Sequence, residues 1–314
     1  MKAVCISLDF ELRWGVRHLY RDDFSKYKVE LDGAKSAAVL LCDYFEEKQI
    51  ASSWATVGAI GLRNWDDFFA KMSRDDLNTR SNFIARDGEF LKENEKYYFA
   101  PEIVEHLCSS SYVELASHTF THLFCCEPHM SEEIFLADGK LVNEVFRSNF
   151  GREVRSIVFP RNQENYTNKL STLGITSYRA VEAGDSAASN TLAGNTLIKK
   201  LLRFSSSINP WASRSSSFNK DCSRASLFLR LNLSSVAWRL HLSRIKNELN
   251  TLLDGECFHL WLHPHNLGSD TNMKLKRFEE VMNIILEHRD NGQVEILSME
   301  QLYELTQNLQ ISSR

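Results

Sequence analysis

The stretch ELASHTFTHLF, residues 114–124, joins a strand-like run to two histidines that lie four residues apart, His118 and His122. The apolar residues before His118 predict a β-strand whose end carries polar side chains. Two histidines at this spacing can bind a metal ion, or they can pack and hydrogen bond within the protein. A catalytic metal site also needs a carboxylate ligand and groups that accept and donate protons. The rest of the chain has to supply these partners.

Short apolar strands alternate with helical segments along most of the chain. This alternation predicts a mainly parallel sheet whose strands are joined by helical crossovers. About seven strands are expected, enough to close a barrel or nearly so. A chain of 314 residues fits a single α/β barrel domain, residues 1–314. The expected strands are AVCISLD (3–9), ASSWATVG (51–58), YVELASH (112–118), SIVFP (156–160), ITSYRAV (175–181), FHLWLH (258–263) and VEIL (294–297).

Capping residues mark the ends of two expected helices. Ser131 can cap the start of the helix that follows the two histidines, and Gly151 can end it. Ser298 and Gln301 have the spacing of a capping box at the start of the last helix. These local signals predict where the helices meet the loops around the sheet.

The overall composition is that of an ordinary globular protein. Hydrophobic residues make up 43% of the chain, and the formal net charge is -4. The seven cysteines include no CxxC pair, so the sequence suggests neither a disulfide framework nor a cysteine-rich zinc module. Neither a secretory signal nor a run of about 18 apolar residues is recognised. We therefore expect a cytoplasmic protein whose cysteines are reduced.

Two insertions interrupt the alternation, near residues 61–100 and near residues 184–235, and both are expected to be irregular. The second is rich in serine and in basic residues. From Lys199 to Lys246, ten basic residues stand against a single acid, Asp221, so this segment carries +9 and the remainder of the chain -13. A solvated loop, a platform for an anionic group and a nucleic-acid surface are the three interpretations. No recognised nucleic-acid module accompanies the charge, so no nucleic acid is expected as a partner.

An anionic partner of this segment can take two forms. One is the diphosphate of a nucleotide-linked or lipid-linked sugar, and the other is the anionic face of a membrane. The stretch LFLRLNLSSVAWRLHL, residues 227–242, interleaves basic residues with leucines and favours contact with a lipid surface. Peripheral contact with the inner face of the membrane therefore stays open beside a purely cytoplasmic location.

Three expected strands end in pairs of ionisable residues. The pairs are Asp9 and Glu11, His118 and His122, and His263 and His265. In barrels of this kind, the loops at the carboxyl ends of the strands build the active site. Two histidines and one carboxylate can hold a metal ion and leave positions open for water and substrate. A second carboxylate and a remote histidine can then move the protons that amide or ester hydrolysis requires.

Four motifs carry a resemblance to a known family. In chain order they are SLDFELRWG (7–15), ELASHTFTH (114–122), VFPRNQ (158–163) and LWLHPHN (260–266). Together they resemble the polysaccharide deacetylases of carbohydrate esterase family four. The resemblance implies a distorted seven-stranded (β/α) barrel that removes the acetyl group from an N-acetylated sugar. It also implies a divalent metal ion, zinc, as cofactor and an N-acetylated carbohydrate as partner.

The resemblance further implies a role for individual residues. The base, the acid, the arginine that pairs with the base, and the three metal ligands correspond to Asp9, His263, Arg161, Glu11, His118 and His122. The family's first motif commonly has two adjacent aspartates, whereas Phe10 separates the two carboxylates of this chain. Alternation along a strand would still place both carboxylates on one face.

Three further residues are expected to contact substrate: Trp14, His265 and Asn266. Trp14 follows the first motif, where an indole can shape the mouth of the site and stack on a sugar ring. Two rival functions stay open: an amidohydrolase of a small non-sugar amide, and a catalytically silent glycan-binding protein with the same cleft. An iron oxygenase is conceivable from the ligand set, but the parallel α/β pattern disfavours it.

Overall fold

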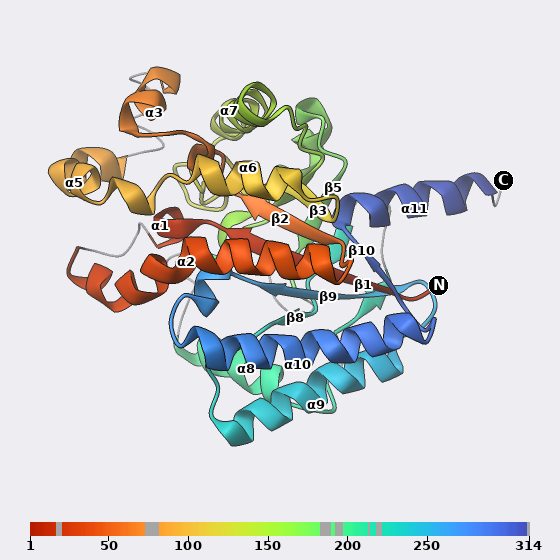
Figure 1. Cartoon of the computed structure of the whole chain (residues 1–314). Helices are drawn as coiled ribbons and strands as arrows, with labels where there is room; N and C mark the ends of the chain where they lie inside the picture. Colours follow the sequence, from red (N-terminus) through yellow and green to blue (C-terminus); the bar gives the residue numbers. More distant parts are fainter. Residues whose placement is uncertain are drawn as a thin grey trace.

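The computed structural model describes residues 1–16, 21–72, 82–182, 190–191, 197–212, 214–217 and 222–312 (Figure 1). Seven strands follow one another in the order β9, β1, β2, β3, β4, β5, β7, and all of their pairings are parallel. These strands are β1 Ala3–Phe10, β2 Ser52–Thr56, β3 Val113–Ser117, β4 Ser156–Val158, β5 Ser177–Ala180, β7 Cys222–Arg224 and β9 Glu256–Leu262. Three short strands extend the sheet: β6 Ser216–Ser217, β8 Leu227–Phe228 and β10 Glu295–Leu297.

Helices lie around the outside of these strands (Figure 1). The α-helices are α1 Leu12–Gly15, α2 Arg21–Glu47, α3 Trp65–Lys71, α5 Asn82–Glu93, α6 Pro101–Ser109, α7 Glu132–Phe150, α8 Leu197–Ile208, α9 Ser235–Thr251, α10 Thr271–Asp290 and α11 Met299–Ser312. Short 3-10 helices are η1 Gly58–Gly61, η2 Glu95–Tyr97, η3 Pro160–Asn162, η4 Thr167–Leu173 and η6 Pro264–Leu267. The alternation of strands and helices confirms the predicted α/β class.

The two ends of the seven-strand path come close enough to make the barrel nearly closed. Strand β8 follows β7 in the chain and pairs in parallel with β9. Across the same seam, Ser223 of β7 hydrogen bonds to Nδ1 of His259 in β9, at 2.9 Å. These contacts confirm the predicted distorted (β/α) barrel of mainly parallel strands.

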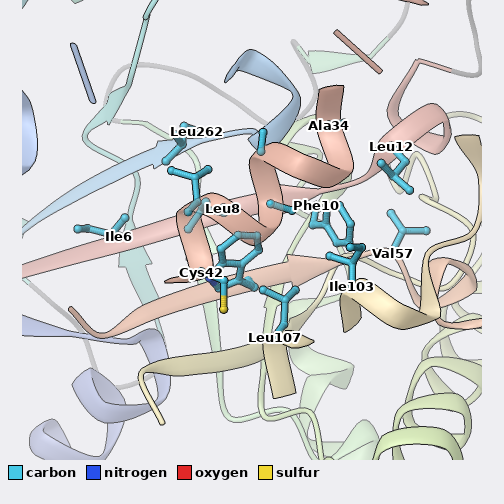
Figure 2. Close-up of a cluster of buried hydrophobic side chains, with 14 of the residues drawn as sticks. Ile6, Leu8, Phe10, Leu12, Ala34, Cys42, Val57, Ile103, Leu107 and Leu262 are labelled. Atoms are coloured by element: carbon cyan, nitrogen blue, oxygen red, sulfur yellow. The ribbon is translucent and has the colours of Figure 1, made fainter. Parts of the chain in front are cut away.

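Strand β1 divides the molecule into an outer core and a barrel interior. Its even-numbered residues point outward, where Ile6, Leu8 and Phe10 pack against helices α2 and α6 (Figure 2). Burial of each such side chain contributes about 1.5–3 kcal/mol to folding. Successive strand residues face opposite sides, so the odd-numbered residues Ser7 and Asp9 face the interior, where both contact Arg179 of β5.

The amino-terminal end of the barrel is filled by small apolar side chains. Ala3 and Cys5 of β1 form a buried cluster with Met299 and Leu302 of α11. Strand β10, which leads into α11, pairs with the first residues of β1, so this helix lies at the same end of the barrel as the N-terminus (Figure 1). The interior is therefore solid at this end, and polar groups occupy the opposite end.

The predicted helix caps are confirmed. The side chain of Ser131 accepts a hydrogen bond from the backbone of Ile134 at the start of α7, and Gly151 ends that helix with a left-handed φ of 63°. At the start of α11, the backbone N–H groups of Ser298 and Gln301 donate to each other's side chains. Local capping chemistry thus determines these helix boundaries, as the sequence predicts.

Both regions expected to be irregular insertions contain regular structure. Helices α3 and α5 lie within residues 61–100. Within residues 184–235, helix α8 and strands β6, β7 and β8 occur, and β7 and β8 complete the barrel. Strands of two or three residues carry too little periodicity to be recognised in a serine-rich sequence, which explains the error.

Residues 227–242, which were expected to contact a lipid surface, are partly buried in the protein. Leu227, Leu229 and Leu231 are buried in the hydrophobic core, and Trp238 is almost as well covered. Leu227, Leu229 and Leu231 therefore stabilise the barrel, whereas Val236 and Leu240 of the same stretch are exposed. Contact of this stretch with a lipid surface stays a prediction.

All seven cysteines are free thiols. Among the helices that the structure describes, none combines the length and the apolar composition that a membrane crossing requires.

Helix α2 approaches the turn after β9 through two glycines. A Cβ built on Gly33 would lie 2.0 Å from the carbonyl oxygen of Gly268, and one on Gly268 would lie 2.0 Å from the carbonyl oxygen of Glu30. Backbone cannot move aside as a flexible side chain can, so neither position has room for a larger residue. This contact fixes the turn that follows His263.

We predict that Gly33→Ala destabilises the protein by about 1–3 kcal/mol, because the added methyl group clashes with backbone. In an open helical position the same substitution would stabilise. The measurement is urea unfolding, with Ser36→Ala, an exposed position of the same helix, as control. An unchanged or raised unfolding midpoint for Gly33→Ala would contradict the packing described above.

Candidate active site

The ionisable residues predicted at three strand ends meet at the carboxyl end of the barrel. Glu11 directly follows β1, His118 directly follows β3, and His263 directly follows β9. His122 lies in the loop after β3. Side chains from positions 9 to 265 of the chain thus share one site because parallel strands end on the same side of the barrel.

Glu11, His118 and His122 form a group that can hold a metal ion. One ligand atom from each residue lies within 4.8 Å of the ligand atoms of the other two. Among the described residues, no other group of three histidine, cysteine or acidic side chains meets this distance. Nε2 of His122 lies 3.0 Å and Nε2 of His118 lies 3.4 Å from Oε2 of Glu11. All three side chains are buried.

The orientation of His118 fits metal binding. Its Nδ1 lies 2.8 Å from the carbonyl oxygen of Val158. A carbonyl only accepts, so Nδ1 carries the proton and the lone pair of Nε2 points toward Glu11. That Nε2 is buried and makes no hydrogen bond, which is unusual for a buried nitrogen unless a ligand completes its environment. A backbone acceptor behind a histidine is also the common arrangement at metal sites.

Both carboxylates at the end of β1 are held in the ionised form. Burial would raise the pKa of Glu11, but His263 and the other two imidazoles lower it well below its ordinary value. Burial would likewise raise the pKa of Asp9, but Arg179, His118 and His263 lower it. The site therefore concentrates two negative charges among basic groups, as a cation site and a proton acceptor require.

The arginine that pairs with Asp9 is Arg179, and the prediction that Arg161 does so is wrong. The two terminal nitrogens of Arg179 donate to the two carboxylate oxygens of Asp9 at 2.8 and 2.9 Å. Arg179 lies on β5 across the barrel from β1 and reaches Asp9 through the interior. The signal in the sequence was an arginine at an inward-facing position within the apolar strand ITSYRAV.

Arg161 instead takes a different place at the site. Its backbone has a left-handed φ of 55°, and its guanidinium carbon lies 5.4 Å from the centre of the Phe124 ring. Its Nε donates to the carbonyl oxygen of Asn190 at 3.4 Å. Arg161 lines the cavity without contacting Asp9, so it remains a candidate for binding substrate.

A buried network of polar side chains inside the barrel holds Arg179 in place. Nη1 of Arg179 also donates to Ser7 at 3.0 Å, and Ser7 hydrogen bonds to Nε2 of His259 at 2.8 Å. The guanidinium lies 4.4 Å from the centre of the Trp261 ring, close enough for a cation–π contact. Burial, and then the charge of Arg179, lower the pKa of His259 to about 3, so this imidazole is neutral.

His263 lies beside both carboxylates. Its Nε2 lies 3.8 Å from Oδ2 of Asp9 and 3.6 Å from Oε1 of Glu11. Its backbone N–H donates to Oδ1 of Asn266 at 3.1 Å, so Asn266 positions His263. The ring of His265 stacks on that of His263 at 4.8 Å. Burial and the adjacent His263 lower the pKa of His265 to about 4, which leaves His265 uncharged near neutral pH.

A cavity of about 210 Å³ opens onto these groups. It is lined by Asp9, Glu11, Gly15, His122, Arg161, Asn162, Asn190, Arg203, Trp261 and His263. Neither His265 nor Asn266 is among these lining residues, so their contact with substrate stays a prediction. Most of the side chains that line this cavity are charged or polar.

Trp14 does not line the cavity, and the prediction that it stacks on a sugar is wrong. Its side chain is 0% exposed. The indole N–H donates to the carbonyl oxygen of Tyr98 at 2.8 Å, and the ring packs against Trp65 and Phe68. Aromatic residues of the 61–100 region thus surround Trp14, and the role of this tryptophan is to anchor that region to the barrel.

Asp138 of α7 is a positioning residue that the sequence reading missed. Its buried carboxylate accepts hydrogen bonds from the backbone N–H groups of Phe120 and Thr121, inside the His118–His122 loop. Within this loop, Thr119 and His122 have left-handed φ values of 59° and 56°, which cost about 1–3 kcal/mol each. The signal was an acidic residue on the apolar face of a helix.

Solved structures with similar folds include a candidate polysaccharide deacetylase from Mycobacterium smegmatis. It is 13% identical, with a TM-score of 0.53, and the match covers 98% of this chain and 91% of that one. A probable polysaccharide deacetylase from Pseudomonas aeruginosa PAO1 is 9% identical, with a TM-score of 0.52 and coverage of 96% and 90%. The chain has the fold of the polysaccharide deacetylases. The predicted resemblance is therefore confirmed at the level of fold.

The polysaccharide deacetylase fold also occurs with other chemistry. A GH57-type branching enzyme from the hyperthermophilic archaeon Pyrococcus horikoshii is 10% identical, with a TM-score of 0.50 and coverage of 96% of this chain and 69% of that one. No protein-family model and no curated protein matches the sequence. The reaction must therefore be argued from the side chains at the site.

We predict that Arg179→Met destabilises the protein by about 3–5 kcal/mol, because it leaves the buried carboxylate of Asp9 without its partner. Arg161→Met, which removes a guanidinium that does not contact Asp9, should change the free energy of unfolding by less than about 1 kcal/mol. Denaturant unfolding of both variants checks this. Similar losses for the two would mean that Asp9 does not depend on Arg179.

Proposed function

We propose that this protein is a metal-dependent hydrolase that removes the N-acetyl group from an N-acetylated sugar, giving an amino sugar and acetate. The observation that carries the proposal is that three residues able to bind a metal ion, an ionised carboxylate and a histidine lie together at the carboxyl end of the barrel. The trio is Glu11, His118 and His122, and the other two groups are Asp9 and His263. The polysaccharide deacetylase fold supports the same class of reaction.

The residues present fit a divalent ion, for which zinc is the proposed choice. Two imidazoles and one carboxylate are a ligand set that zinc enzymes use. When bound, such an ion supplies Lewis-acid polarisation of a carbonyl group and acidification of water. The ionised state of Glu11 and the inward-facing lone pair of His118 are the features of this chain that suit that role.

Asp9 is the proposed general base. Arg179 holds both of its oxygens, so the carboxylate is oriented and ionised when a water molecule approaches the acetamide carbon. Asp9 accepts the proton of that water as the new C–O bond forms. Because a base must lie within hydrogen-bond reach of the proton that it accepts, the rigid placement of Asp9 matters more than its intrinsic basicity.

His263 is the proposed general acid. It faces the cavity beside Asp9 and Glu11, and Asn266 and the ring of His265 hold it there. As the C–N bond of the acetamide breaks, His263 donates a proton to the departing nitrogen. Collapse of the intermediate then gives acetate and a free amine, and the amine leaves without a negative charge.

The carrier of the sugar is proposed to be a nucleotide diphosphate or a lipid diphosphate, met at the cytoplasmic side of the membrane during assembly of a surface polysaccharide. The charge of +9 between Lys199 and Lys246 supports an anionic carrier. The seven free thiols suit a reducing compartment. An intermediate of glycan assembly would meet both conditions.

We predict that the zinc-loaded protein releases acetate from N-acetylated sugars and that Asp9→Asn lowers kcat by about 10²–10⁴-fold. Asp9→Asn should retain stoichiometric metal, because the three ligands are intact. His118→Ala should lose both the ion and the activity. Acetate release and metal content by atomic spectroscopy are measured on each purified variant.

His129→Ala is the matched control, because His129 is exposed and lies in the loop beyond the candidate ligands; it should retain both metal and turnover. Activity of Asp9→Asn equal to wild type would remove Asp9 from the reaction. Turnover of small cyclic amides without acetate release from sugars would favour the amidohydrolase. Glycan binding with no turnover of either substrate would favour the silent binding protein.

A further inference from the structure

A second cavity adjoins the one that opens onto the proposed catalytic groups. It has a volume of about 140 Å³ and shares three lining residues with the first: Asn162, Arg203 and Trp261. A ligand whose acetamide lies near Asp9 can therefore extend from one cavity into the other. The proposed reaction uses none of the groups that are special to the second cavity.

The second cavity is cationic. Arg203 of α8 and Arg230, which follows β8, both line it. The acidic residue in its wall, Glu182, is paired with the guanidinium of Arg214 at 2.6 Å. Three seryl residues contribute further polar groups to the wall: Ser206, Ser207 and Ser226. Two guanidinium groups and one carboxylate therefore line this cavity.

Among the described residues, two buried donors in this cavity have no hydrogen-bond acceptor. Nε of Arg230 and Nε1 of Trp261 are buried nitrogen atoms that make no hydrogen bond. Most buried donors in folded proteins are paired. Both nitrogens belong to residues that line the same small cavity, and both can only donate. A ligand with several acceptor oxygens would satisfy them together.

We propose that this cavity binds a phosphoryl group attached to the N-acetylated sugar. A phosphate monoester or diphosphate carries up to two negative charges near neutral pH and several acceptor oxygens, which match two guanidinium groups and an indole N–H. The proposal rests on the proposed deacetylase function for the identity of the sugar. It assigns the substrate to the class of sugar phosphates and of nucleotide-linked or lipid-linked sugars.

The test compares an N-acetylated sugar 1-phosphate, its nucleoside diphosphate derivative and its uncharged methyl glycoside as substrates. For Arg230→Gln, we expect kcat/KM for the phosphorylated sugars to fall about tenfold to a hundredfold relative to that for the glycoside. Arg63→Gln removes an exposed arginine outside the cavity and should leave that ratio unchanged. Equal losses on charged and uncharged substrates would overturn the proposal.

Binding of inorganic phosphate to the full-length chain separates this inference from the proposed reaction. Phosphate should raise the Tm of the wild-type protein, and Arg230→Gln should abolish most of that rise. This result would support the cavity's role even if no substrate released acetate. A phosphate response that is absent, or equal in wild type and Arg230→Gln, would overturn the proposal whatever the activity.

A separate observation concerns the outward side of α8. Leu197, Ile198, Leu201 and Leu202 are 77%, 71%, 68% and 66% exposed, and Trp211, just beyond the helix, is 86% exposed. The four aliphatic residues recur at helical spacing and share one side. We call these five residues the α8 face. Soluble proteins rarely expose so many large apolar side chains together unless something covers them.

The opposite side of α8 is polar and is directed at the site. Lys199 and Arg203 both hydrogen bond to Oδ1 of Asn190, which lines the first cavity. The backbone carbonyl oxygen of Ser207 accepts a hydrogen bond from Nδ1 of His241 in α9, at 2.7 Å. The helix is therefore held by its polar side, and its apolar side is the one presented outward.

Charge identifies the partner that fits the α8 face. The segment from Lys199 to Lys246 carries +9 and the rest of the chain -13, although Arg214 and Arg244 of the segment pair with Glu182 and Glu248. Arg239 and Lys246 are exposed on α9, the helix packed against α8. Two copies of such a cationic region would repel each other. An anionic lipid surface offers both an apolar layer for the leucines and negative charge for the cations.

We propose that the α8 face lies on an anionic lipid surface, with Trp211 at the level of the headgroups. Arg203, on the inner side of the same helix, lines both cavities. Both cavities would then lie close to the lipid surface. The occupancy of the face does not depend on the reaction, and it can be tested without any turnover.

The test is sedimentation of the full-length protein with vesicles of phosphatidylcholine, with or without phosphatidylglycerol. We expect binding only where phosphatidylglycerol is present, with a blue shift of the fluorescence of Trp211. The double variant Ile198→Ser and Leu201→Ser should weaken binding about tenfold or more, because it removes apolar contact. Val29→Ser, a substitution of an equally exposed apolar residue on α2, is the control and should bind as wild type does.

Absence of binding to phosphatidylglycerol vesicles at low salt would overturn the proposal. So would equal binding by wild type and the double variant. Light scattering tests the remaining occupant, a second copy of the chain: a dimer that dissociates in the double variant would show that the α8 face is a protein interface. The substituted residues are exposed, so loss of folding is not expected.

Discussion

Burial of negative charge is the constraint on which this structure depends. A carboxylate removed from water is costly unless cationic groups compensate it, and β1 ends in two such carboxylates, Asp9 and Glu11. Arg179 compensates the first with two parallel hydrogen bonds, and the imidazoles of His122 and His263 are the basic groups that lie beside the second. These partners come from β5, from the loop after β3 and from the end of β9. The register of the barrel is therefore tied to the electrostatics of its open end.

The inner face of β1 shows how one strand serves both stability and chemistry. Its interior residues change along the strand from alanine and cysteine to serine and then to aspartate, while its outer face remains apolar throughout. The first part packs against α11 and seals the barrel. The last part opens onto the cavity. Side chains alternate along a strand, so the residues that pack in the outer core are not those that face the interior. Polar residues on the inner face therefore do not weaken the packing of the outer core.

The sequence predicted whatever local periodicity and short motifs determine. Strand–helix alternation, the caps at Ser131 and Ser298, and the convergence of Glu11, His118 and His122 were all readable from spacing. The choice between Arg161 and Arg179 was not, because it depends on which side chain crosses the barrel interior. The burial of Trp14 was hidden for a similar reason: its neighbours come from α3 and from residues 98–99, which had no recognisable pattern.

The loop between His118 and His122 has one more consequence. Asp138 holds its backbone from the helix side, and the two left-handed residues are already in place in the folded protein. The loop's own contacts thus order the imidazoles, so that the entropy of arranging them for an ion would be lost in folding and not in coordination. A rigid pair of imidazoles would select between metal ions by their bond lengths. An ion whose preferred bond lengths differ from the spacing of the two imidazoles would have to distort the loop and would therefore bind more weakly.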